Sequence, residues 1–384
     1  MTSSPPIRVG LVGFGTGSSV FHAPLLQSSG RFAVTHVLER STNKSEALTP
    51  RPTIVRSIAE LLAAPIELVV ISTPTGVHFE QAKQAMEAKK HVVVDKPLCI
   101  TAVDAQALVE IAAANGVVFS VFQNRRWDGD FLTVRQLIES GKLGEITHYE
   151  AHFDRYRPTL KGYWKETSPG GGNLYDLGAH LVDQALQLFG TPVAVDADVQ
   201  IQRVGAANDD YFRLEFKYNQ KPGLKVIVTA GMLQKVLGPK YTVVGSKGQF
   251  VKYGEDQQEQ SLCDGLRPGN ASWGQDPETQ YAKFTPADTD QQEQSLRDGL
   301  RPGDASWGQD PETQFAKFTP ADAGAVPETI PTVKGSYEVY YANVADAIQN
   351  GTPLLVHPAE VIDQIRILED ASKKTRVAIV PLDE

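Results

Sequence analysis

Short apolar runs alternate with longer mixed segments over the first third of the chain. Five of these runs are rich in β-branched residues, which favour strands; they are Arg8–Gly13, Phe32–Leu38, Ile66–Ser72, His91–Val94 and Val117–Phe122. Two of the intervals, Gln81–Lys90 and Ala102–Ala114, are rich in the Ala, Glu, Gln and Lys residues that favour helices. This alternation predicts a parallel sheet covered on both faces, the doubly wound α/β fold.

The pattern changes after Asn124, where candidate strands follow one another with short turns. Tyr211–Tyr218 alternates apolar and charged residues with a period of two, which predicts a strand with one face in water. Further candidate strands are Leu224–Thr229, Tyr241–Val244 and Gln249–Tyr253, the last two joined by the turn Gly245–Gly248. We therefore expect an α+β region with a mostly antiparallel, open sheet.

The length of 384 residues is more than one hydrophobic core usually supports, so we expect two domains. The doubly wound domain would cover residues 1–123, and the α+β domain, with roles in substrate binding and oligomerisation, would cover 124–384. Helices are expected near the C-terminus at Tyr337–Gln349 and Pro358–Lys374.

A long segment of the second region occurs twice. Residues 257–288 recur as 291–322 with three differences, at Cys263/Arg297, Asn270/Asp304 and Tyr281/Phe315. Two copies are too few for a solenoid, which needs about three repeats to bury a continuous core. We interpret the pair as a tandem duplication of one surface excursion, and an added binding or assembly loop is the alternative.

Composition excludes several classes of protein. The formal charge of −9 and the scattered basic residues argue against nucleic acid as a partner, and no apolar run approaches the ~20 residues that span a bilayer. The N-terminus has no basic patch followed by an apolar stretch, so it does not resemble a secretion signal. The two cysteines, Cys99 and Cys263, lack the paired spacing of a zinc site and suit a reducing compartment, which predicts a cytoplasmic protein. No other metal-ligand spacing occurs, so no metal is predicted.

A glycine-rich turn follows the first candidate strand. Its residues are Gly13, Phe14, Gly15, Thr16, Gly17 and Ser18, and they open a helix. In this context Gly13 permits a tight turn, Gly15 lets the backbone approach a pyrophosphate, and the helix N-terminus offers free N–H groups. Ser18 stands where the fingerprint has its third glycine, so the helix must pack more loosely on the strand or bend. The motif predicts a dinucleotide-binding site.

The end of the second candidate strand leaves the choice between NAD and NADP open. Glu39 occupies the position where an acid receives the adenosine ribose hydroxyls of NAD. Arg40, Ser41 and Lys44 follow at once and could hold the 2′-phosphate of NADP, or they could be ordinary charges on an exposed loop.

Polar residues follow the next two candidate strands of the parallel sheet. Thr73, Pro74 and His78 come after one of them, and Asp95 and Lys96 come after the other. Ligands bind at the carboxyl edge of such sheets, so we expect these residues to border the cofactor, with Lys96 facing the site.

Four stretches together resemble the Gfo/Idh/MocA family of oxidoreductases, which includes glucose–fructose oxidoreductase and inositol dehydrogenase. The stretches are Gly13–Gly15 with Val20–Pro24, Asp95–Pro97, Gln123–Asp128 and Gly170–Asp183. The likeness covers nearly the whole chain apart from the extra repeat copy. It departs from the family at Asp95, where the usual residue is glutamate.

The resemblance implies an NAD(P)-dependent dehydrogenase or reductase that moves a hydride between nicotinamide and a CH–OH or carbonyl carbon of a sugar or polyol. It assigns the acid–base role to His180, with Asp176 four residues before it on the same helix face. A neighbouring carboxylate would steady the imidazolium, and Lys96 would stabilise the developing alkoxide.

Candidates for the wall of the substrate pocket are aromatic or carry amide or guanidinium donors, which suit a polyhydroxylated ligand. They are Asn124, which could also contact the cofactor, Arg126, Trp127, Tyr163 and Trp164. His22 is a weaker candidate for the cofactor site.

Two further predictions concern the role and the assembly of the protein. The family includes a galactose-gene co-repressor that resembles the enzymes, so the alternative function is a regulator that senses the dinucleotide without reacting with it. Retention of Lys96, Asp176 and His180 favours the enzyme. The open face of the second sheet predicts a homo-oligomer, a dimer or tetramer.

Overall fold

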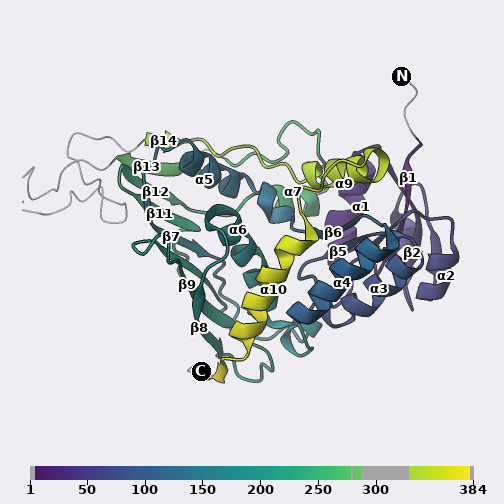
Figure 1. Ribbon diagram of the computed structural model, residues 1–384, viewed down its shortest axis with the longest axis horizontal. Coiled ribbons are helices and arrows are strands. Elements are labelled where there is room, and N and C mark those ends of the chain that lie inside the picture. Colours follow the sequence, from purple (N-terminus) through teal and green to yellow (C-terminus); the bar gives the residue numbers. More distant parts are fainter. Residues whose placement is uncertain (1–4, 278–279, 287–327, 381–384) are drawn as a thin grey trace, which may run out of the picture.

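Two sheets make up the frame of the protein (Figure 1). A computed structural model describes residues 5–277, 280–286 and 328–380. The first sheet and the helices between its strands comprise β1 (Ile7–Val12), α1 (Ala23–Ser28), β2 (Phe32–Leu38), β3 (Thr53–Val55), α2 (Ile58–Ala63), β4 (Leu68–Ile71), α3 (His78–Glu87), β5 (His91–Asp95), α4 (Ala102–Asn115) and β6 (Phe119–Phe122).

The remaining elements follow in chain order. They are α5 (Gly129–Glu139), β7 (Ile146–His152), α6 (Ala179–Phe189), β8 (Ala194–Ile201), β9 (Tyr211–Lys217), β10 (Lys225–Gly231), β11 (Tyr241–Gly245), β12 (Gly248–Lys252), α7 (Gln258–Cys263), β13 (Ala282–Pro286), β14 (Glu328–Ile330), α9 (Glu338–Asn350), α10 (Pro358–Ser372) and β15 (Thr375–Val377).

The first sheet is parallel, with strand order β3-β2-β1-β4-β5-β6, so the prediction of a doubly wound domain is confirmed. Its central strands are apolar throughout because helices cover both faces: the side chains of β4 are fully buried. Thr101 caps α4 by accepting a hydrogen bond from the Asp104 N–H, and left-handed Gly116 ends that helix. The short strand β3 was not predicted, because three residues directly after Pro52 carry too little pattern.

The second sheet has nine strands in the order β14-β13-β12-β11-β7-β10-β9-β8-β15. Most neighbours are antiparallel, while β7 with β10 and β8 with β15 are parallel, which confirms the predicted mixed, mostly antiparallel sheet. The period of two in β9 has the predicted meaning, since Phe212, Leu214 and Phe216 are buried. Strands β7 and β8 were not predicted: β7 has few apolar residues, and β8 mixes apolar with polar residues and buries only Val199.

One face of the second sheet carries helices α5, α6 and α10 (Figure 1). On β7 the side chains of Tyr149 and Ala151 are buried, while those of His148, Glu150 and His152 alternate with them and stay partly exposed. Arg213 and Glu215 occupy the corresponding positions of β9. The second face is therefore lined with charged and polar groups.

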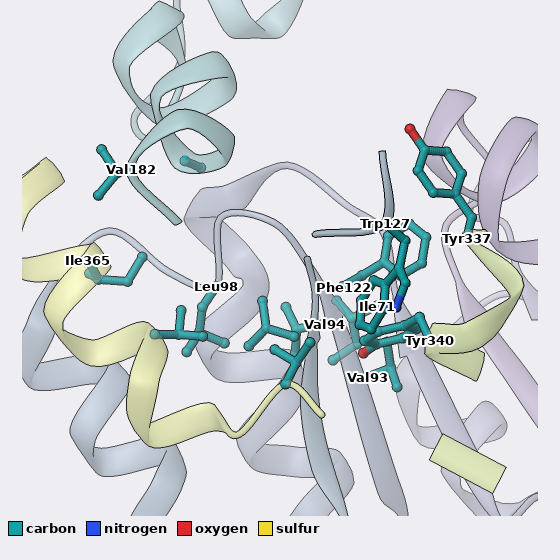
Figure 2. Close-up of a cluster of buried hydrophobic side chains, with 14 of the residues drawn as sticks. Ile71, Val93, Val94, Leu98, Phe122, Trp127, Val182, Tyr337, Tyr340 and Ile365 are labelled. Carbon is teal, nitrogen blue, oxygen red and sulfur yellow. The ribbon is translucent and has the colours of Figure 1, made fainter. Parts of the chain in front are cut away.

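Helices from the C-terminal part return to the first sheet and join the two halves. Helix α10 packs on α4 and on α6. Figure 2 shows the shared apolar cluster, in which Leu98 lies between Val94 of the first sheet and Ile365 of α10, and Phe122 lies beside Tyr340 of α9. This burial joins β6 to α10, which also packs on α6.

The first copy of the duplicated segment is part of the core, so its interpretation as a surface excursion was wrong. Trp273 is fully buried, and its indole N–H donates to Glu338 over 2.9 Å. The buried Gln258 amide bonds the Trp127 carbonyl and the Tyr337 N–H. A repeat in the sequence shows that two copies are similar, but it does not show whether either copy is buried. The second copy, 291–322, lies outside the described residues.

None of the helices that the structure describes is both long enough and apolar enough to cross a membrane. In the same described ranges, no group of three or more His, Cys, Asp and Glu side chains is arranged to hold a metal ion.

Candidate active site

The glycine-rich turn leaves β1 and enters a π-helical segment, Gly17–His22, before α1. Gly13 has a φ of +88°, and an added Cβ would lie 2.8 Å from the Ser72 carbonyl oxygen, so the turn needs glycine there. A Cβ on Gly15 would meet nothing within 4 Å, which leaves open space over the backbone. A pyrophosphate fits this cradle, because the backbone approach and the helix N-terminus suit an anion.

Gly17 provides the close helix–strand contact that the fingerprint's third glycine usually gives. A Cβ on Gly17 would lie 2.2 Å from Ser72 Oγ and 2.6 Å from Asp95 Oδ2. Ser18 turns inward instead and donates its hydroxyl to the Gly13 carbonyl over 2.7 Å. The expected bend is present as the π-helical turn, but the packing is close and not loose.

The Glu39 carboxylate is fully hydrogen-bonded by residues of the loop that follows it. The carboxylate accepts hydrogen bonds from Thr42 Oγ1, the Lys44 N–H and both donors of Ser45, and the residue is 3% exposed. Although burial acts in the opposite direction, the hydrogen bonds from Ser45 and Thr42 lower the pKa of Glu39. The acid is therefore engaged before any ribose arrives, whereas Arg40 and Lys44 are exposed.

The ends of β4 and β5 are tied together by buried polar side chains. Asp95 Oδ2 accepts the Ser72 hydroxyl over 3.0 Å and lies 3.4 Å from His22 Nε2, and although burial opposes it, the His22 contact lowers the pKa of Asp95 to about 2. The His78 ring, 1% exposed, contacts the carbonyls of Thr73 and Pro97. His78 thus holds the two loops together and offers no free nitrogen, while Thr73 and the exposed Pro74 stay at the sheet edge.

Lys96 and Asp176 meet across the two halves of the protein. Lys96 Nζ donates to the backbone carbonyl of Asp176 and to its Oδ1, each over 2.7 Å. Burial lowers the pKa of Lys96, and the charge of Asp176 offsets part of that effect. An ammonium group has three N–H donors, so one remains for a ligand.

Lys165 is a second lysine that contacts Asp176, and the sequence analysis did not predict it as a site residue. Its Nζ lies 2.7 Å from Asp176 Oδ1, so one carboxylate oxygen receives two lysines. Although burial opposes it, these charges hold the pKa of Asp176 well below its usual range. Lys165 follows Trp164 directly, and the only signal in the sequence was this place beside two candidate aromatic residues.

No hydrogen bond or ion pair joins Asp176 to His180 among the residues that the structure describes. The chain is π-helical over Leu174–Gly178 and α-helical from Ala179, so the spacing of four spans a change of helix type. The Asp176 carboxylate contacts Lys96 and Lys165, and the charges that act most strongly on His180 are positive.

His180 is enclosed in a cationic, apolar environment. It is 5% exposed, its Nδ1 has no hydrogen-bond partner in the described part of the chain, and its ring meets Phe153 edge-on at 6.2 Å. Burial, followed by the charges of Lys96, Arg125, Lys240 and Lys165, lowers the pKa of His180 well below its usual value. The ring is thus neutral at pH 7 and able to accept a proton.

Lys240 is an unexpected member of that environment. Its buried Nζ lies 2.9 Å from the centroid of the Phe153 ring and has no hydrogen-bond partner among the described residues. Burial lowers the pKa of Lys240 to about 8. No local pattern indicates this environment, since Lys240 precedes an ordinary strand.

The proposed pocket wall divides into two groups. Arg126 is 4% exposed, pairs with both oxygens of Asp183 and reaches Glu360, and Trp127 packs edge-on against Tyr340, as Figure 2 shows. These two side chains join elements of the core and do not line the pocket described below. Local sequence could not predict this, because it does not show that Asp183 lies opposite Arg126 in the fold. Asn124 is buried, 4% exposed, and is not among the residues that line that pocket.

Tyr163 and Trp164 belong to a loop that borders a pocket. Tyr163 is 39% exposed and lines the pocket together with Asp176, and the Lys165 ammonium lies 6.0 Å from the Trp164 ring. Of the predicted wall, this loop is the part that the structure brings beside Lys96 and Asp176.

A parallel sheet of this order, a glycine cradle at its edge and a lysine beside it define a dinucleotide-binding oxidoreductase. Comparison with known proteins agrees. Residues 7–123 match the NAD-binding Rossmann fold of an oxidoreductase family, and residues 135–377 match the C-terminal alpha/beta domain of that family. The chain belongs to the Gfo/Idh/MocA oxidoreductase family, and its cofactor is NAD or NADP.

Its relatives include characterised dehydrogenases. The chain is 37% identical to scyllo-inositol 2-dehydrogenase (NADP(+)) IolW of Bacillus subtilis, over 96% of this chain and 94% of the relative. It is 28% identical to D-glucoside 3-dehydrogenase of Escherichia coli, over 53% and 60% of the two chains. The solved structure of the oxidoreductase yvaA of Bacillus subtilis superposes with a TM-score of 0.83 at 36% identity, covering 97% of each chain. These proteins give no support to the alternative of a non-catalytic regulator.

Proposed function

We propose that the protein is a dehydrogenase that interconverts a CH–OH group and a carbonyl in a sugar or polyol, with a preference for NADP. The observation that carries the proposal is the double contact of Lys96 Nζ with Asp176, which leaves one ammonium N–H free for a ligand. The charge of Lys96 also acts on the buried His180, whose pKa it helps to lower. IolW and the D-glucoside dehydrogenase are the relatives that suggest the substrate class.

The residues divide the reaction between them. The bound nicotinamide supplies the acceptor or donor of the hydride. Lys96 donates a hydrogen bond to the substrate oxygen and stabilises the negative charge that grows on it. His180 takes the hydroxyl proton in the oxidation direction and returns it in the reduction direction. Asp176 and Lys165 hold the Lys96 ammonium in place.

The loop after β2 supports NADP over NAD. Glu39 has no free acceptor left for the 2′-hydroxyl, whereas Arg40 and Lys44 are exposed with no ion pair in the described ranges. The 2′-phosphate of NADP would meet two cations there, with the Ser41 hydroxyl between them. IolW is an NADP-dependent relative.

Self-association through the open face of the nine-stranded sheet is part of the same proposal. The face carries both signs of charge, since Arg213 lies beside Glu150, so a two-fold related copy could pair unlike charges across it. Sedimentation velocity at micromolar concentration should give a dimer or tetramer, and a monomer alone would contradict this part.

The central experiment is a titration of protein fluorescence with NADPH and NADH, followed by a screen of inositols, glucosides and other polyols for absorbance change of the nicotinamide. Turnover of at least one of them, abolished with retained cofactor binding in Lys96→Met, supports the proposal. Tight cofactor binding without turnover of any CH–OH compound or its carbonyl counterpart would refute it.

A further inference from the structure

The pocket beside Asp176 holds more positive charge than its own acids neutralise. It lies where β8 and β10 end and β9 begins, and its wall includes Arg157, Lys161, Lys165 and Arg203. Such an accumulation is notable in a chain with a formal charge of −9.

Two of these four cations are already paired. Lys165 contacts Asp176, and Arg203 contacts Asp210 at 2.9 Å and Glu166 at 3.4 Å. The acidic partners neutralise these two cations, so Lys165 and Arg203 add little to the electrostatic attraction of an anionic ligand.

Arg157 and Lys161 are different. Both are exposed, and neither has an ion-pair partner among the described residues. Asp209, another wall residue, balances them only in part, because burial raises its pKa to about 7. The mouth of the pocket therefore has two free cations.

Both free cations stand on backbone that is held in place. The Arg157 N–H donates to the Met232 carbonyl over 2.7 Å, and the Arg157 carbonyl accepts from Arg203 over 3.1 Å. The buried Glu166 carboxylate accepts the N–H groups of Lys161 and Gly162. The loop is thus built around its own buried acid, and the two side chains are presented to the pocket by fixed anchors.

We propose that this pocket binds an oxyanion of the substrate, a carboxylate or a phosphate carried by the sugar, with Arg157 and Lys161 as the cations that hold it. The inference rests on the proposed function, because Asp176 lines the pocket and also contacts Lys96. A sugar whose reacting carbon lies at Lys96 would extend its charged end toward the pocket mouth. The substrate class is then a sugar acid or sugar phosphate, and not a neutral polyol.

Calorimetric binding in the presence of NADPH tests the inference without requiring turnover. The probes are D-glucuronate, D-glucose 6-phosphate and neutral D-glucose. We expect one of the two anions to bind at least tenfold more tightly than D-glucose, and to weaken when NaCl rises from about 0.05 to 0.5 M, as expected for ion pairs screened by salt. The anion that wins identifies carboxylate or phosphate as the source.

The variants are Arg157→Gln and Lys161→Gln, which change exposed side chains and preserve the backbone anchors. Each should weaken binding of the preferred anion by about tenfold and change D-glucose binding less than twofold. Lys221→Gln is the matched control, an exposed lysine in the turn between β9 and β10, at the end of these strands away from the pocket. Equal binding of all three probes, or equal losses in the control, would overturn the inference.

Turnover separates the two proposals. Catalysis on neutral polyols without preference for anions would preserve the dehydrogenase and refute the anion site. Anion binding that depends on Arg157 and Lys161, in a protein that turns over no CH–OH compound, would preserve the site and refute the dehydrogenase.

Discussion

The two walls of the active site are built in different ways. On the cofactor side, each functional residue comes directly after a strand of one parallel sheet, as Gly13 follows β1 and Lys96 follows β5. On the opposite side, Lys240 comes from a segment far in the sequence from Lys165 and Asp176, and the wall is held by long-range contacts, such as that between Glu166 and Arg203. The first wall is therefore local in the sequence, and the second exists only when the fold is complete.

The contrast matters because chemistry needs both walls. The cofactor side can bind its ligand with the second wall damaged, since the glycine cradle and the Glu39 loop make their contacts within the first sheet. Variants of the second wall should therefore separate turnover from cofactor binding.

Replacement of His180 gives the sharpest separation and the largest expected effect. His180→Ala should lower turnover by about 10²–10⁴, because a positioned acid–base group typically contributes that factor. Affinity for NADPH, measured by fluorescence titration, should change less than threefold. His357→Ala, at an exposed histidine that begins α10, is the control and should keep its turnover. Unchanged turnover in His180→Ala would remove this residue from the mechanism.

The duplicated segment offers a second comparison, between its two copies. Trp273→Ala should lower the free energy of unfolding by about 3–5 kcal/mol, because it empties a fully buried indole site. Denaturant unfolding followed by fluorescence measures the loss.

Deletion of Gln291–Gly324 should instead leave a folded, cofactor-binding protein. Seven residues would then join β13, which ends at Pro286, to β14, which begins at Glu328, and a loop of that length can connect two antiparallel strands. Collapse on deletion would show that the second copy is needed for the core.

Cofactor choice tests the first wall by itself. Arg40→Ser should weaken NADPH binding by about tenfold, equivalent to ~1.4 kcal/mol, and leave NADH binding nearly unchanged, because only NADPH carries the 2′-phosphate. The ratio of the two dissociation constants is the readout. A wild-type preference for NADH would contradict the assignment of Arg40 and Lys44.

The pH dependence of oxidation gives the smallest effect and tests the second wall. A general base works when it is neutral, above its pKa. The lowered pKa of His180 should therefore keep the acid limb of kcat for oxidation below the pH at which an ordinary histidine titrates. Lys240→Met removes one of the charges that lower that pKa, so its acid limb should move to higher pH. Lys221→Met is the surface control, and an identical profile in both variants would exclude Lys240 from the electrostatics of the site.

Much of the first wall was predictable because its signals are local. The apolar run before Gly13 and the one before Lys96 fix both the strand and the edge at which the next residue appears. The prediction that failed on this wall concerned the hydrogen-bond partners of a correctly placed residue. Glu39 lies where the pattern places it, but its carboxylate oxygens accept hydrogen bonds from Thr42 and Ser45. Nothing in the sequence shows that these internal hydrogen bonds form in place of bonds to the ribose of a ligand.

The second wall was predictable in its members only in part. His180 and Asp176 were identified by resemblance, but their relation was not, since the change from π-helix to α-helix between them alters which side chains face each other. Arg126 pairs with the buried Asp183, and Lys240 lies over the face of the Phe153 ring. Both contacts depend on tertiary packing and cannot be predicted from the spacing of residues in the sequence.

By itself, the sequence determined the two sheets, the glycine cradle and the identity of the groups that can carry charge and protons. Only the tertiary structure decided how those charges are shared: which acid serves which lysine, which cation stays free and why His180 is neutral. The physical reason is that strand and turn preferences act over a few residues, whereas burial and Coulomb interactions depend on every group within several ångströms, wherever it lies in the chain.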